Sequence, residues 1–302
     1  MIPGLLGFSR VDGGRGEGLG WSGPLRSQPM RILIVGGSGF LGNELVRQSA
    51  TDGHVVAATY LTRPGTAPGV DWLPLDVGDR TAVADLIGAF SPDVVVNAAY
   101  RQADWVTTAV GAAHVAVAIS GNGGRLVHVS SDAVFSGKAI TYAEDCVPDP
   151  VSPYGAAKAA AEAAVQVIDP TAVIARTSLI IGDDGGSPHE RLVHSLATGG
   201  MHGMLFTDEV RCPVHVCDLA AALLELANSD RAGIHHVAGA DAMTRYELGC
   251  LIAQRDGLDP ARLPTGRRAE TDVPGPIDVR LDCVLTQGHL KTRLRGAREF
   301  VK

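Results

Sequence analysis

The sequence predicts an α/β fold in which a doubly wound parallel sheet carries a smaller C-terminal lobe. Short apolar runs alternate with helical stretches from Arg31 onward, a glycine-rich turn joins the first run to the first helix, and the alternation breaks into loops after Gly182. Parallel strands that are buried on both faces appear as continuous apolar runs, and crossover helices separate them along the chain.

The first half of the chain supplies these elements in order. The strands are expected over 31–35, 54–60, 70–76, 93–99 and 125–131, and the helices over 40–50, 81–90 and part of 107–120. Strands that alternate with helices in this way are typical of a Rossmann-type sheet.

The glycine-rich turn has the sequence GGSGFLG and places Gly36, Gly39 and Gly42 between the first strand and the first helix. Bare backbone at such a turn can approach a pyrophosphate, whose charge then meets the helix N-terminus. A tight turn without a ligand is the alternative. We therefore expect a flexible leader over residues 1–29 and a dinucleotide-binding domain over 30–181.

The end of the second strand indicates which nicotinamide dinucleotide binds. An acidic side chain there would bind the ribose 2'-hydroxyl and repel a 2'-phosphate. The stretch ATYLTRPG offers Thr59, Thr62 and Arg63 but no carboxylate. This pattern favours NADP over NAD, with Arg63 as a phosphate clamp rather than a solvated loop arginine. Asp76, after the third strand, is expected either to accept from the adenine amino group or to cap the next helix.

The second half interrupts the regular alternation. A helix is expected over 191–200, a hairpin over 201–216, and a helix over 218–229 with Asp218 as its N-cap. We therefore expect residues 182–302 to depart from the regular alternation of the sheet.

Composition and charge disfavour several classes of function. The 302 residues carry a net charge of -7, which argues against nucleic acid or an anionic membrane as a partner. No apolar run is long enough to span a bilayer. Five scattered cysteines suit free thiols in a reducing compartment, so we expect a cytoplasmic protein. Cys212, His215 and Cys217 could ligate a metal, but no second ligand cluster follows, so we expect packed thiols and no metal.

A tyrosine and a lysine interrupt the alanine-rich stretch SPYGAAKAAAEAA. Tyr154 and Lys158 lie one turn apart on the same face of a helix. An ammonium near a phenol lowers the pKa of the phenol toward neutral, which would make Tyr154 a usable general acid. A chance pair on a solvent-facing helix is the alternative.

Three separated features form a motif set: the glycine turn, NAA at 97–99, and VSSDAVFSG followed by Tyr154 and Lys158. Together they resemble the extended short-chain dehydrogenase/reductase superfamily. Within it, SSDAVFSG, TYAEDCVPDPVSPYGAAK, RCPVHVCDLA and GIHHVAGADAMTRYELG are most similar to nucleotide-sugar ketoreductases of the dTDP-4-dehydrorhamnose reductase type. The resemblance covers the chain from about Met30 to its C-terminus. It implies a mainly substrate-binding lobe over 182–302, interleaved with the last strands of the sheet, with the ligand in a crevice at the carboxyl ends of the strands.

The resemblance implies a role for each matching residue. Tyr154 would donate the proton to the carbonyl oxygen as hydride arrives from the nicotinamide, Lys158 would lower the pKa of Tyr154 and bind the ribose hydroxyls, and Ser131 would orient the carbonyl. Substrate contacts would come from Ser131, Asp132 and Arg211, although a salt bridge of Arg211 with Asp208 or Glu209 is an equal alternative. The implied cofactor contacts are Gly36, Ser38, Gly39, Phe40, Leu41, Gly42, Thr59, Arg63, Asp76, Val77, Ala98, Ala99, Tyr154, Lys158 and Ser178.

Two positions depart from the pattern of the family. Thr108 stands roughly where relatives carry an asparagine that supports a proton-relay water, which puts the relay in doubt. Ala133 replaces an aromatic residue in SSDAVF, so the substrate pocket is expected to be wider there.

The expected function is NAD(P)H-dependent reduction of a keto group on a nucleotide-linked deoxysugar, with a small-molecule nucleotide sugar as partner and a homodimer as a compatible assembly. Two alternatives stay open. One is an epimerase or dehydratase that retains NAD, and the other is a non-catalytic NADP-binding regulatory subunit similar to the methionine adenosyltransferase beta subunit.

Overall fold

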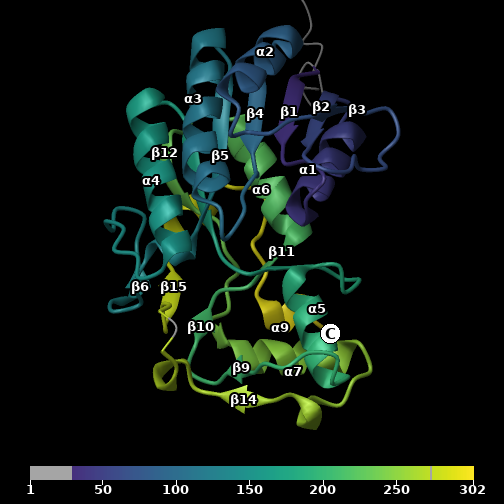
Figure 1. The fold of residues 1–302 in the computed structure, drawn as a ribbon, viewed down its shortest axis with the longest axis vertical. Coiled ribbons are helices and arrows are strands. Elements are labelled where there is room, and N and C mark those ends of the chain that lie inside the picture. Colours follow the sequence, from purple (N-terminus) through teal and green to yellow (C-terminus); the bar gives the residue numbers. More distant parts are fainter. Residues whose placement is uncertain (1–28, 273) are drawn as a thin grey trace, which may run out of the picture.

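The computed structural model describes residues 29–272 and 274–302. The predicted leader therefore lies outside the described residues, apart from Pro29. A parallel seven-stranded sheet forms the upper half of the molecule, and a smaller lobe lies below it (Figure 1). The strand order is β12 (Gly233–His236), β7 (Val173–Thr177), β5 (Arg125–Ser131), β4 (Val94–Asn97), β1 (Arg31–Val35), β2 (Val55–Tyr60) and β3 (Asp71–Pro74). The predicted α/β fold is confirmed.

The strand order reverses between β1 and β4. The chain runs outward from β1 through β2 to β3, then returns to β4 on the other side of β1, where Val35 pairs with Asn97. A parallel sheet that reverses in this way opens a crevice at the carboxyl ends of the two central strands.

Helices cover both faces of the sheet. On one face lie α1 (Phe40–Thr51) and α6 (Val216–Ala227); on the other lie α2 (Arg80–Phe90), α3 (Gly111–Asn122) and α4 (Pro153–Ile168) (Figure 1). A π-helical turn, η1 (Val106–Val110), leads directly into α3.

The strands contribute to two apolar cores. In β1, Ile32 and Ile34 enter the core under α1 and α6, whereas Leu33 and Val35 enter the core under α2, α3 and α4. Successive side chains of a strand point to opposite faces. This explains why both faces of the strand are apolar and why the run RILIV has no polar alternation.

The lobe contains α5 (Pro188–Ala197), α7 (Arg245–Arg255), α9 (Ala297–Phe300) and short strands, packed around a third apolar cluster (Figure 1). Its pairs are β9 (Leu205–Phe206) with β14 (Thr265–Gly266), β10 (Val210–Arg211) with β13 (Met243–Thr244), and β11 (Val214–His215) with β8 (Ile180–Ile181). The predicted hairpin over 201–216 is therefore wrong, because its three short strands pair with three remote segments.

The remaining short elements lie around these layers. β6 (Ile140–Tyr142) pairs with β15 (Val279–Leu281), and the other elements are η2 (Asp132–Val134), η3 (Pro260–Arg262), η4 (Arg268–Glu270) and α8 (Val284–Gln287).

One predicted helix cap is wrong, and one of the two alternatives for Asp76 is excluded. His215 rather than Asp218 caps α6, accepting from the Cys217 N–H, while Asp218 pairs with Arg295 at 2.8 Å. The side chain of Asp79, not that of Asp76, caps α2.

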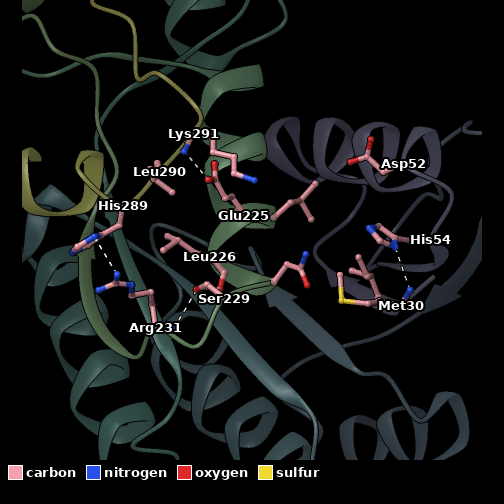
Figure 2. Close-up of a pocket in the computed structure, with 13 residues that line it drawn as sticks. Met30, Asp52, His54, Glu225, Leu226, Ser229, Arg231, His289, Leu290 and Lys291 are labelled. Carbon is pink, nitrogen blue, oxygen red and sulfur yellow. Dashed lines mark hydrogen bonds between the residues drawn. The ribbon is translucent and has the colours of Figure 1, made fainter. Parts of the chain in front are cut away.

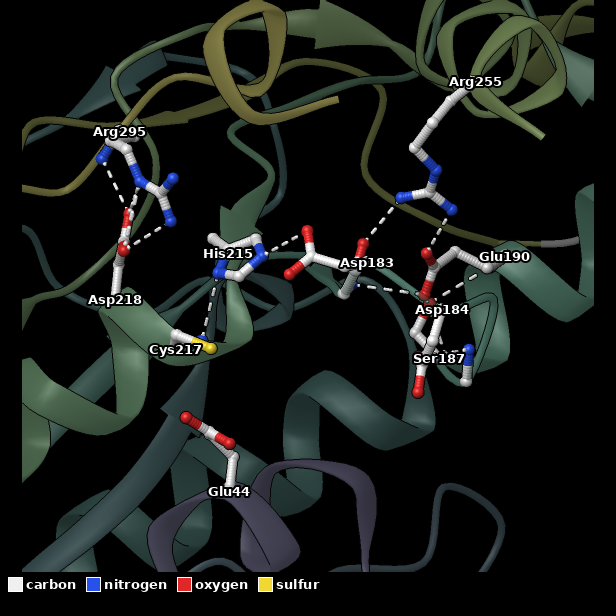
Figure 3. A network of polar contacts seen from close by, with 12 residues as sticks. Glu44, Asp183, Asp184, Ser187, Glu190, His215, Cys217, Asp218, Arg255 and Arg295 are labelled. Atoms are coloured by element: carbon white, nitrogen blue, oxygen red, sulfur yellow. Dashed lines mark hydrogen bonds and ion pairs between the residues drawn. The ribbon is translucent and has the colours of Figure 1, made fainter. Parts of the chain in front are cut away.

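A polar network joins the lobe to the sheet through the loop that follows β8 (Figure 3). Arg255 on α7 donates to the Gly182 carbonyl and pairs with Glu190, both at 2.6 Å, and His215 contacts Asp183 at 3.0 Å. A Cβ at Gly182 would lie 2.8 Å from the Phe40 ring. The lobe is therefore tied to a loop that touches the first residue of α1.

Candidate active site

The glycine turn takes the shape that its sequence predicts. Gly36 adopts a φ of 82°, a conformation that L side chains rarely adopt. A Cβ at Gly42 would lie 2.2 Å from the Gly36 carbonyl oxygen, so α1 could not pack so closely on the turn. Thr59, predicted as a cofactor contact, is buried and accepts from the Gly36 N–H at 3.0 Å. Its hydroxyl group holds the turn in place.

The first turn of α1 keeps backbone donors for an anion. Gly39 is its N-cap, and among the described residues no side chain caps this end and no acidic residue lies in its first turn. By contrast, side chains cap α2, α4, α5 and α7. Uncapped N–H groups at a helix N-terminus attract phosphate.

A pocket of about 200 Å³ opens beside the glycine turn at the carboxyl ends of β1, β2 and β4. Most of the predicted cofactor contacts line it. Leu41 and Gly42 are instead buried under the turn, and Phe40 packs against Gly182. The lining residues are Gly36, Ser38, Gly39, Thr59, Tyr60, Leu61, Leu75, Asp76, Val77, Ala98, Ala99, Tyr100, Arg101 and Thr107.

Arg63 lines an adjoining cavity of about 530 Å³, which shares Ser38 with the first pocket. The other lining residues are polar or small: Asn43, Thr62, Pro64, Gly65, Thr66 and Ala67. Among the described residues that form this cavity there is no carboxylate. An exposed guanidinium with hydroxyl and amide neighbours suits a phosphate group.

The three predicted catalytic residues lie together at the end of β5 and the start of α4. The Ser152 hydroxyl accepts from the Gly155 N–H and thereby caps α4. A Cβ at Gly155 would lie 2.0 Å from the Ala133 carbonyl oxygen, so glycine is what permits α4 to approach the segment after Ser131. This approach places Tyr154 close enough to Ser131 for the serine to affect the pKa of the phenol.

Burial dominates the electrostatics of Tyr154 and Lys158. The pKa of the Tyr154 phenol is raised by burial and by the nearby Tyr100 and Asp132, although a hydrogen bond with Ser131 acts in the opposite direction. The predicted lowering of this pKa by Lys158 is therefore wrong. Burial lowers the pKa of Lys158 to about 8, against the opposing effect of Glu162. A protonated phenol at neutral pH is the form that can donate a proton.

Tyr100 is a site residue that sequence reasoning missed. It is half exposed and lines the pocket beside the glycine turn, and its ring centroid lies 5.9 Å from that of Tyr154 and 5.4 Å from the Lys158 Nζ. The available signal was its position, directly after the NAA motif that ends the fourth strand.

The other predicted contacts form a buried polar network beneath Ser131. Ser178 donates to Asp132 at 2.7 Å and accepts from the Cys212 N–H at 3.2 Å. Arg211 is buried, lies 3.6 Å from Asp132 and 3.4 Å from Glu209, and donates to backbone carbonyls including that of Pro276 at 2.7 Å. Arg211 thus forms the salt bridge with Glu209 that was one of the two alternatives.

The region around Cys212, His215 and Cys217 is packed. Both ring nitrogens of His215 are engaged, one with the Cys217 N–H and the other with Asp183. In residues 29–272 and 274–302, no three His, Cys, Asp or Glu side chains are grouped as metal ligands, and no helix is long and apolar enough to cross a membrane.

A separate cavity of about 420 Å³ lies at the opposite edge of the sheet (Figure 2). Met30 precedes β1, and Asp52 and His54 lie between α1 and β2, so this cavity borders the amino ends of the strands. Its other wall includes Glu225, which accepts from the Lys291 N–H at 2.6 Å. Ligands of open parallel sheets bind at the carboxyl ends. The candidate active site is therefore the edge that carries the glycine turn.

Comparisons with known proteins show which family the chain resembles. A family model described as the RmlD substrate binding domain matches residues 30–302. A dTDP-4-dehydrorhamnose reductase of Mycolicibacterium smegmatis is 30% identical over 287 residues, covering 90% of this chain and 84% of that protein. The methionine adenosyltransferase 2 subunit beta of Xenopus laevis is 30% identical over 279 residues, covering 84% of this chain and 80% of that protein.

A solved structure shares the fold. The dTDP-4-dehydrorhamnose reductase of Bacillus anthracis in complex with NADP has a TM-score of 0.76 and 21% sequence identity, and the match covers 91% of this chain and 97% of that chain. At this identity the likeness supports the fold alone.

Proposed function

Because the chain belongs to the family of the RmlD substrate binding domain, we propose that it reduces a keto group on a nucleotide-linked deoxysugar with NAD(P)H. The observation that carries this proposal is the convergence of Ser131, Tyr154 and Lys158 on one edge of the sheet, beside the uncapped start of α1. The name of the Mycolicibacterium smegmatis relative supports the choice of substrate class.

The described residues fit a nicotinamide dinucleotide. The glycine turn and the free N–H groups of α1 suit its pyrophosphate, and the pocket that contains Ala98 and Ala99 lies at the switch point of the sheet. When bound, this group supplies the hydride.

Tyr154 is the proposed general acid. Reduction of a ketone builds negative charge on its oxygen, and a donor within hydrogen-bonding distance stabilises that charge. The Tyr154 phenol is protonated at neutral pH, although its raised pKa makes it a weaker acid than an ordinary tyrosine, and Ser131 offers a second hydroxyl beside it. We assign Tyr154 to proton donation and Ser131 to orientation of the carbonyl.

The Arg63 cavity supports NADP as the preferred cofactor. Arg63, Thr62 and Ser38 surround a space next to the dinucleotide pocket that suits a 2'-phosphate, while NAD would leave the guanidinium without a charged partner. Asp132 is proposed to act on the substrate side through Ser131, which donates to it at 3.3 Å.

A substrate panel tests the proposal. Purified protein, NADPH and a set of 4-keto-6-deoxy nucleotide sugars should give loss of NADPH absorbance and the matching alcohol. No turnover across the panel would remove the proposal. Tightly held NAD that is unchanged while a sugar is converted would instead identify an epimerase or dehydratase.

A regulatory subunit is a second candidate, because one relative of equal identity is named as a methionine adenosyltransferase subunit. Intact Ser131, Tyr154 and Lys158 favour the enzyme. Recovery of a stoichiometric enzyme partner, together with a Tyr154→Phe variant that leaves the function of the complex unchanged, would favour the subunit.

The cellular location, the oligomeric state and the domain division of the protein stay predictions. Five free cysteines support a reducing, cytoplasmic location. Light scattering tests the expected homodimer, and limited proteolysis tests the expected division between residues 181 and 182.

A further inference from the structure

Tyr100 connects the dinucleotide pocket to the catalytic side chains. It lies three residues beyond Asn97, where β4 ends, and the residue is 52% exposed. The ring lines the pocket and also approaches Tyr154 and Lys158, with the distances given above. A side chain in this position can affect both groups without reacting itself.

Thr108 fixes the backbone next to Tyr100. Thr108 is 1% exposed and lies on the π-helical turn η1. Its hydroxyl donates to the Arg101 carbonyl at 2.7 Å and accepts from the Arg101 N–H at 3.1 Å. In the same segment, the Asp104 carboxylate accepts a hydrogen bond from the Thr107 hydroxyl at 2.8 Å. The buried Thr108 hydroxyl thus hydrogen-bonds to both the N–H and the carbonyl of Arg101, the residue that follows Tyr100.

We propose that Thr108 is a positioning residue that acts through the Arg101 backbone to hold the Tyr100 ring over Tyr154 and the Lys158 ammonium. This inference rests on the proposed function and assigns a role to two residues of that same site. Thr108 has one hydroxyl proton, which Arg101 accepts.

The surroundings of Lys158 explain why a ring face matters there. On α4, Glu162 lies near Lys158. On β5, His128 lies near it, and the Val129 carbonyl accepts a hydrogen bond from Nζ at 2.9 Å. The pKa of His128 lies well below its usual value because of burial and Lys158, so this ring is neutral. Burial disfavours the ammonium, whereas an aromatic face within about 6 Å stabilises it. Tyr100 and Glu162 therefore favour the charged form.

Titration of Lys158 tests the inference directly. Protein in which the lysine Cε atoms carry an isotope label gives few NMR signals. The signal of Lys158 is the one that is missing from the spectrum of a Lys158→Met variant. The chain has four lysines: Lys138, Lys158, Lys291 and Lys302. Tyr100→Leu should lower the midpoint of Lys158 by about 0.5 or more, because the cation–π contact is lost. Thr108→Val should lower it in the same direction.

Conservative variants separate positioning from general damage. Tyr100→Phe keeps the ring and Thr108→Ser keeps the hydroxyl, so both should retain the wild-type midpoint. Thr51→Val is a matched control, since this hydroxyl donates to the Arg47 carbonyl at the far end of α1. Unchanged Lys158 midpoints in Tyr100→Leu and Thr108→Val would overturn the inference.

Activity provides a second readout. In the reductase assay, Tyr100→Leu and Thr108→Val should lower kcat by about tenfold through misplacement of the acid. The alkaline limb of their pH profiles should move to lower pH. If the wild-type protein reduces no sugar in the panel, the proposed function fails, while the NMR midpoints still decide whether Thr108 positions Tyr100.

Discussion

Arg176 and Glu162 form a buried ion pair between β7 and α4, with 2.8 Å between Nη2 and Oε2 and both side chains almost fully enclosed. Arg176 belongs to β7 and Glu162 to α4, so the pair joins the helix that carries Tyr154 to the sheet. Ser130 on β5 also donates to Glu162. The pair therefore fixes α4 relative to the strand that ends in Ser131.

Removal of one partner should destabilise the fold. Arg176→Met leaves the Glu162 carboxylate buried without its countercharge, which typically costs about 3–5 kcal/mol. The double variant Arg176→Met, Glu162→Leu removes both charges and should recover much of that loss. Urea unfolding measures the free energy of unfolding of each variant. A double variant no more stable than Arg176→Met would contradict this account.

Tyr154→Phe should abolish most of the reductase activity while preserving the site. Loss of a general acid lowers kcat by about 10²- to 10⁴-fold. The dissociation constant for NADPH should stay within about twofold, because the ring and its packing remain. Fluorescence titration and steady-state kinetics give the two values, with Tyr246→Phe on α7 as the control. Full activity of Tyr154→Phe would exclude Tyr154 as the acid.

Arg63 should decide between the two dinucleotides. Arg63→Ala removes the guanidinium from its cavity and should weaken NADPH binding by about tenfold or more, since a charge-assisted contact to phosphate is lost. NADH binding should be nearly unaffected. Arg267→Ala, 60% exposed on the lobe, is the control for a general change in charge. Equal losses for NADPH and NADH would place Arg63 outside the phosphate site.

The stability of the protein should fall as the pH is lowered from 6.5 toward 4. His236 is fully buried, and burial, with a contribution from Arg176, lowers its pKa to about 4. The unfolded chain, with a histidine pKa near 6.5, then binds more protons than the folded chain across this window. The contribution of His236 to the free energy of unfolding is thus complete above about pH 6.5 and is lost progressively below it.

Substitution of His236 tests this source of acid sensitivity. Thermal unfolding of His236→Gln should show a shallower decline between pH 6.5 and 4.5 than the wild-type protein, whereas the exposed control His202→Gln should follow the wild-type curve. Carboxylates with lowered pKa values, such as Glu209, contribute only below this range. An unchanged slope in His236→Gln would contradict the assignment.

Local sequence was sufficient for the sheet and the glycine turn. The strands β1, β2 and β4 are mainly apolar runs, and Gly36 and Gly42 lie where a positive φ and a close backbone approach require glycine. Both features arise from residues that are close to one another in the sequence. A short stretch of sequence is therefore enough to predict them.

The lobe could not be predicted in the same way. β9, β10 and β11 are two-residue strands whose partners lie before β9 or well beyond β11 in the chain. Such short pairs have no periodicity of their own, so the segment over 201–216 appeared to be a hairpin. The cap of α6 was likewise misplaced, because His215 and Asp218 both suit a helix start.

Within the active site, spacing revealed the residues but not their energetics. The interval between Tyr154 and Lys158 predicts one shared helix face, yet the sign of the pKa change at Tyr154 depends on burial by other elements. Tyr100 comes from one of those elements, the loop after β4. Its contacts become visible only in three dimensions.

The fate of the hydride tests the central claim most directly. NADPH that carries deuterium at the transferable position is incubated with the protein and a 4-keto-6-deoxy nucleotide sugar, and the product is analysed by mass spectrometry. The account predicts an alcohol with one deuterium at the former carbonyl carbon, and almost none of this product with Tyr154→Phe. A converted sugar without deuterium, or equal labelling by Tyr154→Phe, would contradict it.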